Sequence, residues 1–276
     1  MKIAVWSPTP FAGRKSCNLL LLALQAIGED GKEQLILHAD PIGSGPEHFL
    51  LSGRHRSRMM EQNEFGIEFL CRLLRCERFS KEAVTNAAYT FAEGKLHILP
   101  SGSRPFYEGD KCKTAEEVCN IIRAAGEVFH NVWIELPAGE SMFTERVLNE
   151  ADCVIVNLAQ SPCEGEKLTG LPKLKHAFYL LGAYEQRTIY TVHNMMLLFP
   201  GLRGRCAVIP YHTGFFEACC SGEAERFWLR GVSTAEDKAC STFFREVKKT
   251  YRKWKEGCSP EICEQENGML QTDRNL

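Results

Sequence analysis

Short, almost continuous apolar runs alternate with longer helical patterns along this chain, and this alternation limits the folds it can adopt. Strands buried on both faces read as such runs, because helices cover both sides of a parallel sheet. The β-α-β order implies right-handed crossovers. The sequence therefore predicts an α/β fold with a doubly wound, mostly parallel sheet flanked by helices. The expected strands are Ile3–Ser7, Gln34–Ala39, Leu96–Pro100, Val132–Leu136, Cys153–Leu158, Ala177–Gly182 and Ala207–Pro210.

The expected helices lie between these runs and leave no obvious domain boundary. A chain of 276 residues is long enough to bury a large core. We therefore expect one domain over residues 1–257 and a polar C-terminal tail over 258–276. The expected helices are Lys15–Ile27, Arg58–Cys76, Lys81–Phe91, Ala115–Phe129, Met142–Glu150 and Asp237–Lys255.

Charge and hydropathy exclude several classes of protein. The 33 Lys and Arg residues nearly balance the 35 Asp and Glu residues, which argues against nucleic-acid binding driven by bulk charge. The longest apolar run, Leu19 to Leu24, is far shorter than the roughly 20 residues of a membrane span. No secretory signal precedes the first strand, so we expect a cytoplasmic protein. The 13 cysteines include no CxxC pair, which favours free thiols over a zinc site.

Ligands of an open parallel sheet bind beyond the carboxyl ends of its strands. The first such loop, Ser7–Ser16, joins a strand directly to a helix, as phosphate-binding loops do. Pro8 and Pro10 remove two backbone donors from it. The position predicts an anion site, and the alternative is a turn that only connects two elements.

This loop departs from the Walker pattern G-x-x-x-x-G-K-[ST] in either of two alignments. In the first, Gly13 is the second glycine, Arg14 takes the lysine position and Lys15 the hydroxyl position. In the second, Lys15 and Ser16 fill the lysine and hydroxyl positions, but Thr9 and Arg14 replace the glycines. The residues alone leave both alignments open.

Two acidic residues stand at the ends of expected strands. Asp40 follows the second strand and could hold a metal-bound water, or could only cap a turn. Glu135 lies between apolar residues in the strand of residues 131–136 and could be a metal ligand, or could accept bonds from loop N–H groups.

Several short segments occur in an order that resembles a known family. They are the loop with Gly13, "LILHADPIGSG", "ILPSG", "VWIELPAGES", "ADCVIVNLAQS" and "VIPYHTGF". The order resembles the ParA/MinD family of deviant-Walker ATPases, and within it the TadZ/CpaE-like proteins that place pilus machinery at a cell pole. The resemblance covers about residues 1–255.

The resemblance implies a nucleotide site, with ATP or ADP and Mg²⁺ as cofactors, although the altered loop equally allows none. Asp40 would be the catalytic residue if the protein is active. Ser16, Asp40 and Glu135 would hold Mg²⁺. The implied nucleotide contacts are Gly13, Arg14, Lys15, Ser16, Pro210 and Tyr211.

Departures from the family pattern argue against hydrolysis. Thr9 stands where the family has a lysine that reaches the partner's nucleotide, and His38 replaces the first acid of the D-x-D-P segment. The resemblance matches the Walker lysine to Arg14 and the magnesium-binding hydroxyl to Lys15, leaving Ser16 as the only hydroxyl retained. Arg14 is no geometric substitute for a lysine. We therefore expect a positioning or scaffolding factor for a pilus or secretion apparatus, with weak or no hydrolysis. Its partners would be proteins of a localised assembly, with a possible homodimer and recruitment to a membrane or pole. A slow Mg-ATPase using Arg14 or Lys15 is the first alternative.

The second alternative is a peripheral membrane module that uses the helix expected at Asp237–Lys255. Its apolar stripe predicts either a core face or a membrane-binding face, and aromatic residues at helical spacing favour the core. A basic cluster, Arg54–Arg58, predicts either an acidic partner or a solvated helix start. The stripe consists of Cys240, Phe243, Phe244, Val247, Tyr251 and Trp254.

Overall fold

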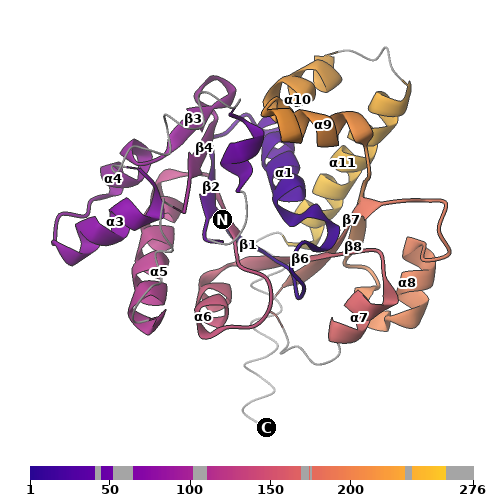
Figure 1. Ribbon diagram of the computed structural model, residues 1–276, viewed down its shortest axis with the longest axis horizontal. Helices are drawn as coiled ribbons and strands as arrows, with labels where there is room; N and C mark the ends of the chain where they lie inside the picture. The colour runs from indigo at the N-terminus through magenta and orange to yellow at the C-terminus, as the bar shows by residue number, and fades with distance from the viewer. Residues whose placement is uncertain are drawn as a thin grey trace, which may run out of the picture.

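A computed structural model of the chain contains one eight-stranded sheet with helices on both faces (Figure 1). It describes residues 1–40, 45–51, 65–101, 111–168, 174, 176–233 and 238–258. All seven expected strands are present, and the predicted fold class is confirmed. The strands are β1 Lys2–Trp6, β2 Gln34–His38, β3 Tyr89–Phe91, β4 Leu96–Leu99, β5 Asn131–Glu135, β6 Cys153–Leu158, β7 Ala177–Tyr184 and β8 Cys206–Pro210.

The sheet has the strand order β3-β4-β2-β5-β1-β6-β7-β8 and is parallel except at one edge. There β3 pairs antiparallel with β4, Tyr89 lying opposite Ile98. The predicted helix Lys81–Phe91 is therefore wrong beyond Asn86. Tyr89, Thr90 and Phe91 have aromatic or β-branched side chains that favour a strand, and the free edge of β4 supplies their backbone partners.

The helices agree with the sequence prediction where an apolar stripe is long. Helix α6 matches its prediction residue for residue, whereas the short helices α7 to α10 were not predicted. For the helix expected at Arg58–Cys76, residues 58–64 lie outside the described residues, as does the cluster Arg54–Arg58. The helices are α1 Lys15–Asp30, α3 Gly66–Arg75, α4 Lys81–Asn86, α5 Lys111–Val128, α6 Met142–Glu150, α7 Pro162–Leu168, α8 Val192–Leu198, α9 Thr213–Ser221, α10 Ala224–Ser233 and α11 Lys238–Gly257, with 3-10 turns η1 Ala12–Arg14, η2 Pro46–Phe49, η3 Ala92–Gly94 and η4 Pro200–Leu202.

Each central strand contributes side chains alternately to two cores, one on each face of the sheet. Ala4 and Trp6 of β1 belong to the core shared with α3, α4, α5, α6 and α8. Ile3 and Val5 point the other way, into the core shared with α1, α9, α10 and α11. This alternation explains why the strands read as unbroken apolar runs.

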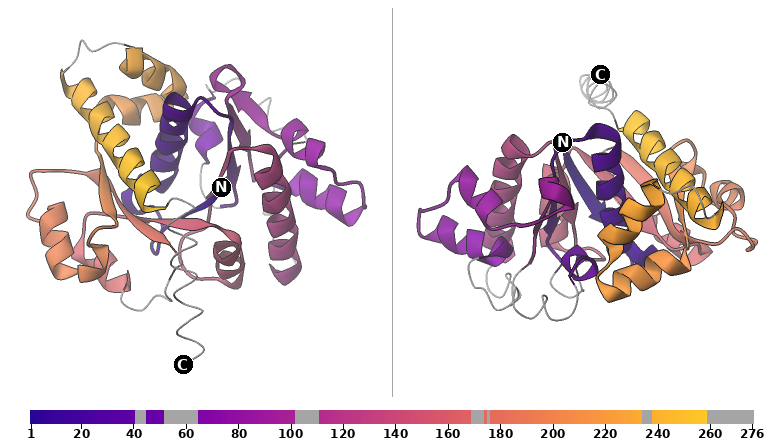
Figure 2. Two further views of the ribbon diagram at one scale, coloured as in Figure 1. Left: turned by 180° about the vertical axis from the view of Figure 1, so that it is seen from behind. Right: turned by 90° about the horizontal axis from the view of Figure 1, so that it is seen from above.

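Helix α11 packs beside α1, and its aromatic stripe is part of the second core (Figure 2). Phe243, Val247 and Trp254 are at most 3% exposed, which confirms the core prediction for the stripe. Its basic face reaches α1 instead, since Lys248 and Arg252 both pair with Glu29. None of the described helices is long and apolar enough to span a bilayer. Of the predicted polar tail, Cys258 is buried and residues 259–276 lie outside the described residues.

Candidate functional site

The predicted site residues gather where β1, β2 and β5 end. These three strands are neighbours in the sheet, and β2 pairs with β5 so that His38 lies opposite Glu135. The loop after β1 turns at η1 and enters α1 at Lys15. The topology therefore brings the Ser7–Ser16 loop, Asp40 and Glu135 to one edge of the sheet.

The backbone of the loop is left-handed at three residues. Phe11, Gly13 and Arg14 have φ angles of 59°, 54° and 57°. The Cα of Gly13 lies against β6, and a Cβ built on it would lie 2.4 Å from the carbonyl oxygen of Leu158. Glycine is needed at this position because any side chain would collide with the backbone of the sheet.

Two buried asparagines hold the loop against the sheet, and the sequence analysis did not single them out. Asn157 of β6 donates from Nδ2 to the carbonyl of Ala12 at 2.7 Å. Asn18 of α1 donates to the carbonyl of Gly13 at 2.6 Å and to Asn157 Oδ1 at 2.7 Å. The available signal was an amide within the otherwise apolar strand Cys153–Leu158, since buried polar groups need partners.

Ser16 is the hydroxyl residue of the loop that reaches the strand-end acid. Its Oγ donates to Glu135 Oε1 at 2.5 Å. Arg14, one residue before Lys15, has the left-handed backbone that glycine adopts most readily. Both observations support the second alignment, in which Arg14 replaces a glycine and Lys15 and Ser16 follow it.

Lys15 points into the acid pair rather than over the loop. Its Nζ lies 3.1 Å from Asp40 Oδ2 and 3.6 Å from Glu135 Oε1, and it donates to the carbonyl of Leu136. The Lys15 side chain is 9% exposed and that of Glu135 only 1%. The second oxygen of Glu135, Oε2, is buried and has no hydrogen-bond partner among the described residues. The ammonium thus neutralises part of a buried negative charge.

Arg14 also turns away from the loop, onto two aromatic rings. Its guanidinium carbon lies 3.9 Å from the ring centre of Phe216 and 4.7 Å from that of Tyr211. Tyr211 directly follows Pro210, the last residue of β8. The structure therefore brings the predicted Pro210–Tyr211 segment to the loop and adds Phe216, which the sequence analysis did not propose for the site.

Thr9 is tied to α7. Its Oγ1 donates to the buried carboxylate of Glu164 and accepts from Lys167 Nζ at 2.8 Å. Neither Glu164 nor Lys167 was a predicted site residue. Thr9 replaces the lysine that the resemblance leads one to expect, and its hydroxyl is used within the chain.

His38 forms a buried ion pair beside this cluster. Its Nδ1 lies 3.1 Å from Glu47 Oε1, and both side chains are at most 5% exposed. Burial alone would lower the pKa of His38, but the attraction of Glu47 outweighs it and raises the pKa from 6.5 to about 9. Burial likewise opposes the charge of Glu47, yet His38 holds the pKa of that carboxyl well below its usual value. A Cβ at Gly45 would lie 2.1 Å from His38 Nδ1, so the pair fills all the space beside this glycine.

The cluster as arranged does not fit a magnesium ion. Ser16, Asp40 and Glu135 supply the oxygen atoms that Mg²⁺ prefers. The ammonium of Lys15, however, lies between the two carboxylates where such an ion would be held. Among the described residues no group of three or more His, Cys, Asp or Glu side chains could hold a metal ion. The predicted roles in metal and nucleotide binding stay predictions.

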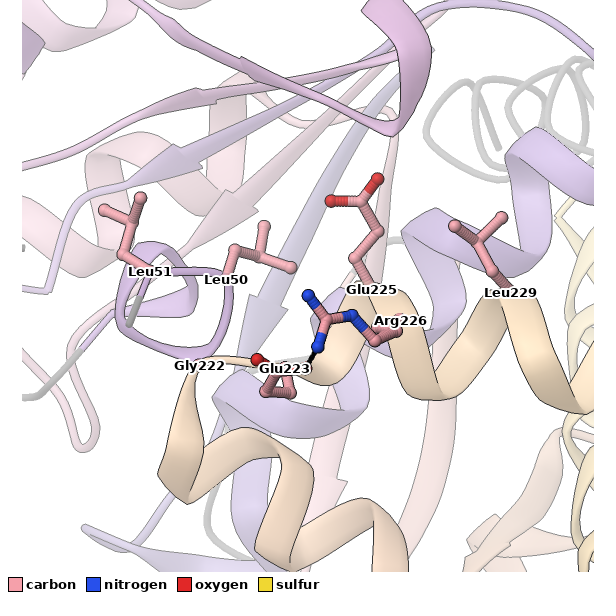
Figure 3. A pocket seen from close by; sticks show the side chains of 7 residues that line it. All are labelled: Leu50, Leu51, Gly222, Glu223, Glu225, Arg226 and Leu229. Carbon is pink, nitrogen blue, oxygen red and sulfur yellow. Dashed lines mark ion pairs between the residues drawn. The ribbon is translucent and has the colours of Figure 1, made fainter. Parts of the chain in front are cut away.

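A separate cavity of about 370 Å³ lies between η2 and the start of α10 (Figure 3). Leu50 and Leu51 line one side, and Glu225 and Leu229 of α10 the other. None of the loop or strand-end residues lines it, so this cavity is distinct from the predicted site.

Comparison with solved structures identifies proteins that share the fold of this chain. A ParA family ATPase from Chlorobium tepidum has a TM-score of 0.66 at 15% identity, covering 92% of this chain and 97% of its own. The chain has the fold of the ParA and MinD ATPases. The septum site-determining protein MinD from Pyrococcus horikoshii, complexed with Mg-ADP, has a TM-score of 0.61 at 16% identity, covering 89% of this chain and 93% of its own. A plasmid partition protein of Borrelia burgdorferi bound to AMPPNP has a TM-score of 0.62 at 12% identity, covering 93% of this chain and 97% of its own.

These likenesses are structural, because the identities are low. No family model matches the sequence, and no curated protein matches it either. The ParA/MinD-like fold predicted from the short motifs is confirmed.

Proposed function

We propose that this protein is a degenerate member of the ParA/MinD family that acts as a positioning or scaffolding factor with weak or no nucleotide hydrolysis. One observation carries the proposal. Both basic side chains of the loop bind elsewhere in the chain, Arg14 on the rings of Tyr211 and Phe216 and Lys15 on Asp40 and Glu135.

Phosphoryl transfer depends on positive charge held at the transferred group. In this loop Arg14 and Lys15 would have to leave their present partners to supply that charge. The resemblance, read with Arg14 as the Walker lysine, puts Thr9 at the cross-dimer lysine, whereas in the second alignment Thr9 replaces the first glycine. In both alignments Thr9 has no charge to offer and is bonded to Glu164 and Lys167. The same fold can still present a surface to partner proteins without turnover.

The positioning role is supported by what the similar structures are named for. One is a septum site-determining protein and another a plasmid partition protein. The motif order further resembles the TadZ/CpaE-like proteins, so we propose a pilus or secretion apparatus as the assembly that is placed. The partners would be proteins of that assembly, with recruitment to a membrane or pole through them.

A slow Mg-ATPase is the second candidate, and one contact favours it. Ser16 reaches Glu135 at 2.5 Å, the arrangement expected if Ser16 fills the hydroxyl position and Lys15 the lysine position. In that case Lys15 would exchange Asp40 for a phosphate when nucleotide enters. The buried stripe of α11, by contrast, leaves the membrane-binding alternative without the exposed apolar face that it needs.

ATP turnover of the purified protein separates the two candidates. We expect turnover with Mg²⁺ no higher than a buffer blank. Turnover above the blank that Lys15→Ala or Arg14→Ala abolishes would establish the ATPase instead; Lys249→Ala, on the exposed face of α11, is the matched control.

The positioning role is tested in the native host with a fluorescent fusion. We expect a discrete focus that depends on the assembled apparatus, and that Arg14→Ala leaves in place. A uniform distribution in cells that build the apparatus would contradict the role.

A further inference from the structure

We propose that the ammonium of Lys15 is a built-in substitute for a divalent cation, so that this strand-end site works without Mg²⁺. The inference deepens the proposed function. It rests on that function in one respect: a nucleotide bound at this loop would be bound without a metal ion. It concerns the residues between β2, β5 and α1.

The ammonium occupies the centre of a set of oxygen atoms. Asp40 Oδ2 lies at 3.1 Å, Glu135 Oε1 at 3.6 Å, and the carbonyl of Leu136 accepts a hydrogen bond from Nζ. The hydroxyl of Ser16 holds the same Glu135 oxygen. Carboxylate, carbonyl and hydroxyl oxygens are the donors that Mg²⁺ and Mn²⁺ take. The structure presents this donor set to a lysine of its own chain.

Burial of the ionised Glu135 carboxylate favours a cation at this point. Glu135 is 1% exposed, and its Oε2 has no hydrogen-bond partner among the described residues. A buried carboxylate without a counter-charge is strongly unfavourable, so removing one member of such a pair is costly. Lys15, itself 9% exposed, supplies that charge from the first turn of α1.

In this geometry the Lys15 ammonium and a metal ion would compete for the same site. The two carry charge of the same sign, and both need the space between Asp40 and Glu135. A metal ion can enter only if Lys15 leaves. Shortening Lys15 to serine should therefore create a metal site where the wild-type protein has none.

Metal binding is measured with Mn²⁺ alone, from the electron paramagnetic resonance signal of the free ion. We expect Lys15→Ser to bind Mn²⁺ at least about tenfold more tightly than the wild-type protein, about 1.4 kcal/mol. Glu135→Gln added to Lys15→Ser should remove this gain. Lys249→Ser, which changes an exposed lysine of α11, should behave as the wild type.

Thermal unfolding supplies a second readout, because a ligand that binds only the folded state raises its Tm. Mn²⁺ and Mg²⁺ should raise the Tm of Lys15→Ser and leave that of the wild type unchanged. If Lys15→Ser fails to fold alone, refolding in excess Mn²⁺ replaces this measurement. Recovery only with Mn²⁺ supports the proposal, and no recovery contradicts it.

Two results would overturn the inference. One is wild-type Mn²⁺ binding as tight as that of Lys15→Ser and lost in Glu135→Gln. The other is a folded Lys15→Ser that binds Mn²⁺ no better than the wild type. The assay contains no nucleotide, so either result leaves the positioning role to be decided by the turnover and localisation experiments.

Discussion

At the strand ends, individual charged side chains are each held by a partner within the chain. Arg14 stacks on aromatic rings, Lys15 lies between two acids, and His38 pairs with Glu47. A loop in a phosphate-binding position thus has its basic groups already engaged. Any anion that binds there competes with these contacts and gains only the difference in free energy.

The His38–Glu47 pair makes stability depend on pH. The pKa of His38 is about 9 in the folded protein and 6.5 ordinarily, so its stabilisation is complete below pH 6.5 and is lost as the pH rises toward 9. We expect the free energy of unfolding to fall across that window by roughly 2–3 kcal/mol. Denaturant titrations at several pH values measure it.

Glu47→Gln is the control, because it removes the charge that raises the pKa of His38. The variant should be less stable near pH 6 and should show little of the decline between pH 6.5 and 9. An equal decline in both proteins would assign the effect to other groups.

Close packing of the loop on the sheet gives a prediction at Gly182 of β7. A Cβ at this residue would lie 1.9 Å from the carbonyl oxygen of Gly13 and 2.2 Å from Asn18 Nδ2. Gly182→Ala should therefore push the loop off the sheet and cost about 1–3 kcal/mol of stability. Gly201 has nothing within 4 Å of its Cβ position, so Gly201→Ala should be neutral or slightly stabilising. Equal unfolding midpoints for the two variants would contradict the prediction.

Among the elements, α1 and α11 form a unit on one face of the sheet. The basic face of α11 meets the acidic end of α1, with Lys255 bonded to Asp30 at 2.5 Å and the Tyr251 hydroxyl to Asp30 at 2.7 Å. Its aromatic face lies against the strands, where Trp254 and Trp133 have ring centres 5.1 Å apart. Helix α11 therefore stabilises the helix that carries the loop at its other end.

Trp254→Ala tests this packing. The side chain is 1% exposed, and its loss should cost about 3–5 kcal/mol, as large aromatic truncations in cores do. Trp254→Phe should cost much less, because it keeps most of the ring and removes an indole N–H that has no partner among the described residues. Lys249→Ala, with a 73% exposed side chain, should change stability by less than about 0.5 kcal/mol. A Trp254→Ala melt like that of the wild type would show that the stripe is not core.

Across the whole molecule, the sequence predicts what depends on long patterns. Continuous apolar runs identify the seven parallel strands, and the long stripe of α11 identifies a core helix. The edge strand Tyr89–Phe91 was missed because three residues carry little pattern and the free edge of β4 decides their conformation. The seven-residue helices α7 and α8 are similarly short.

The candidate site, like the fold, was predicted only in part from the sequence. Asp40 and Glu135 were placed together because neighbouring parallel strands end at one edge of the sheet. The direction of Lys15 and Arg14 could not be predicted, since it depends on distant partners such as Phe216 and on the free energy of burying each charge. Asn157 had a signal in the sequence, but the carbonyl that it binds is known only from the fold.

The strand order also determines when the chain can fold during its synthesis. Strand β1 pairs only with β5 and β6 among the described strands, and the apolar helix α1 is covered by α11, which begins at Lys238. At about 5–20 residues per second, a ribosome needs on the order of tens of seconds to reach that point after making Leu19–Leu24. Throughout this interval the contacts between α1 and α11 cannot form, so the helix that carries the loop lacks one of its covering partners until α11 has been made.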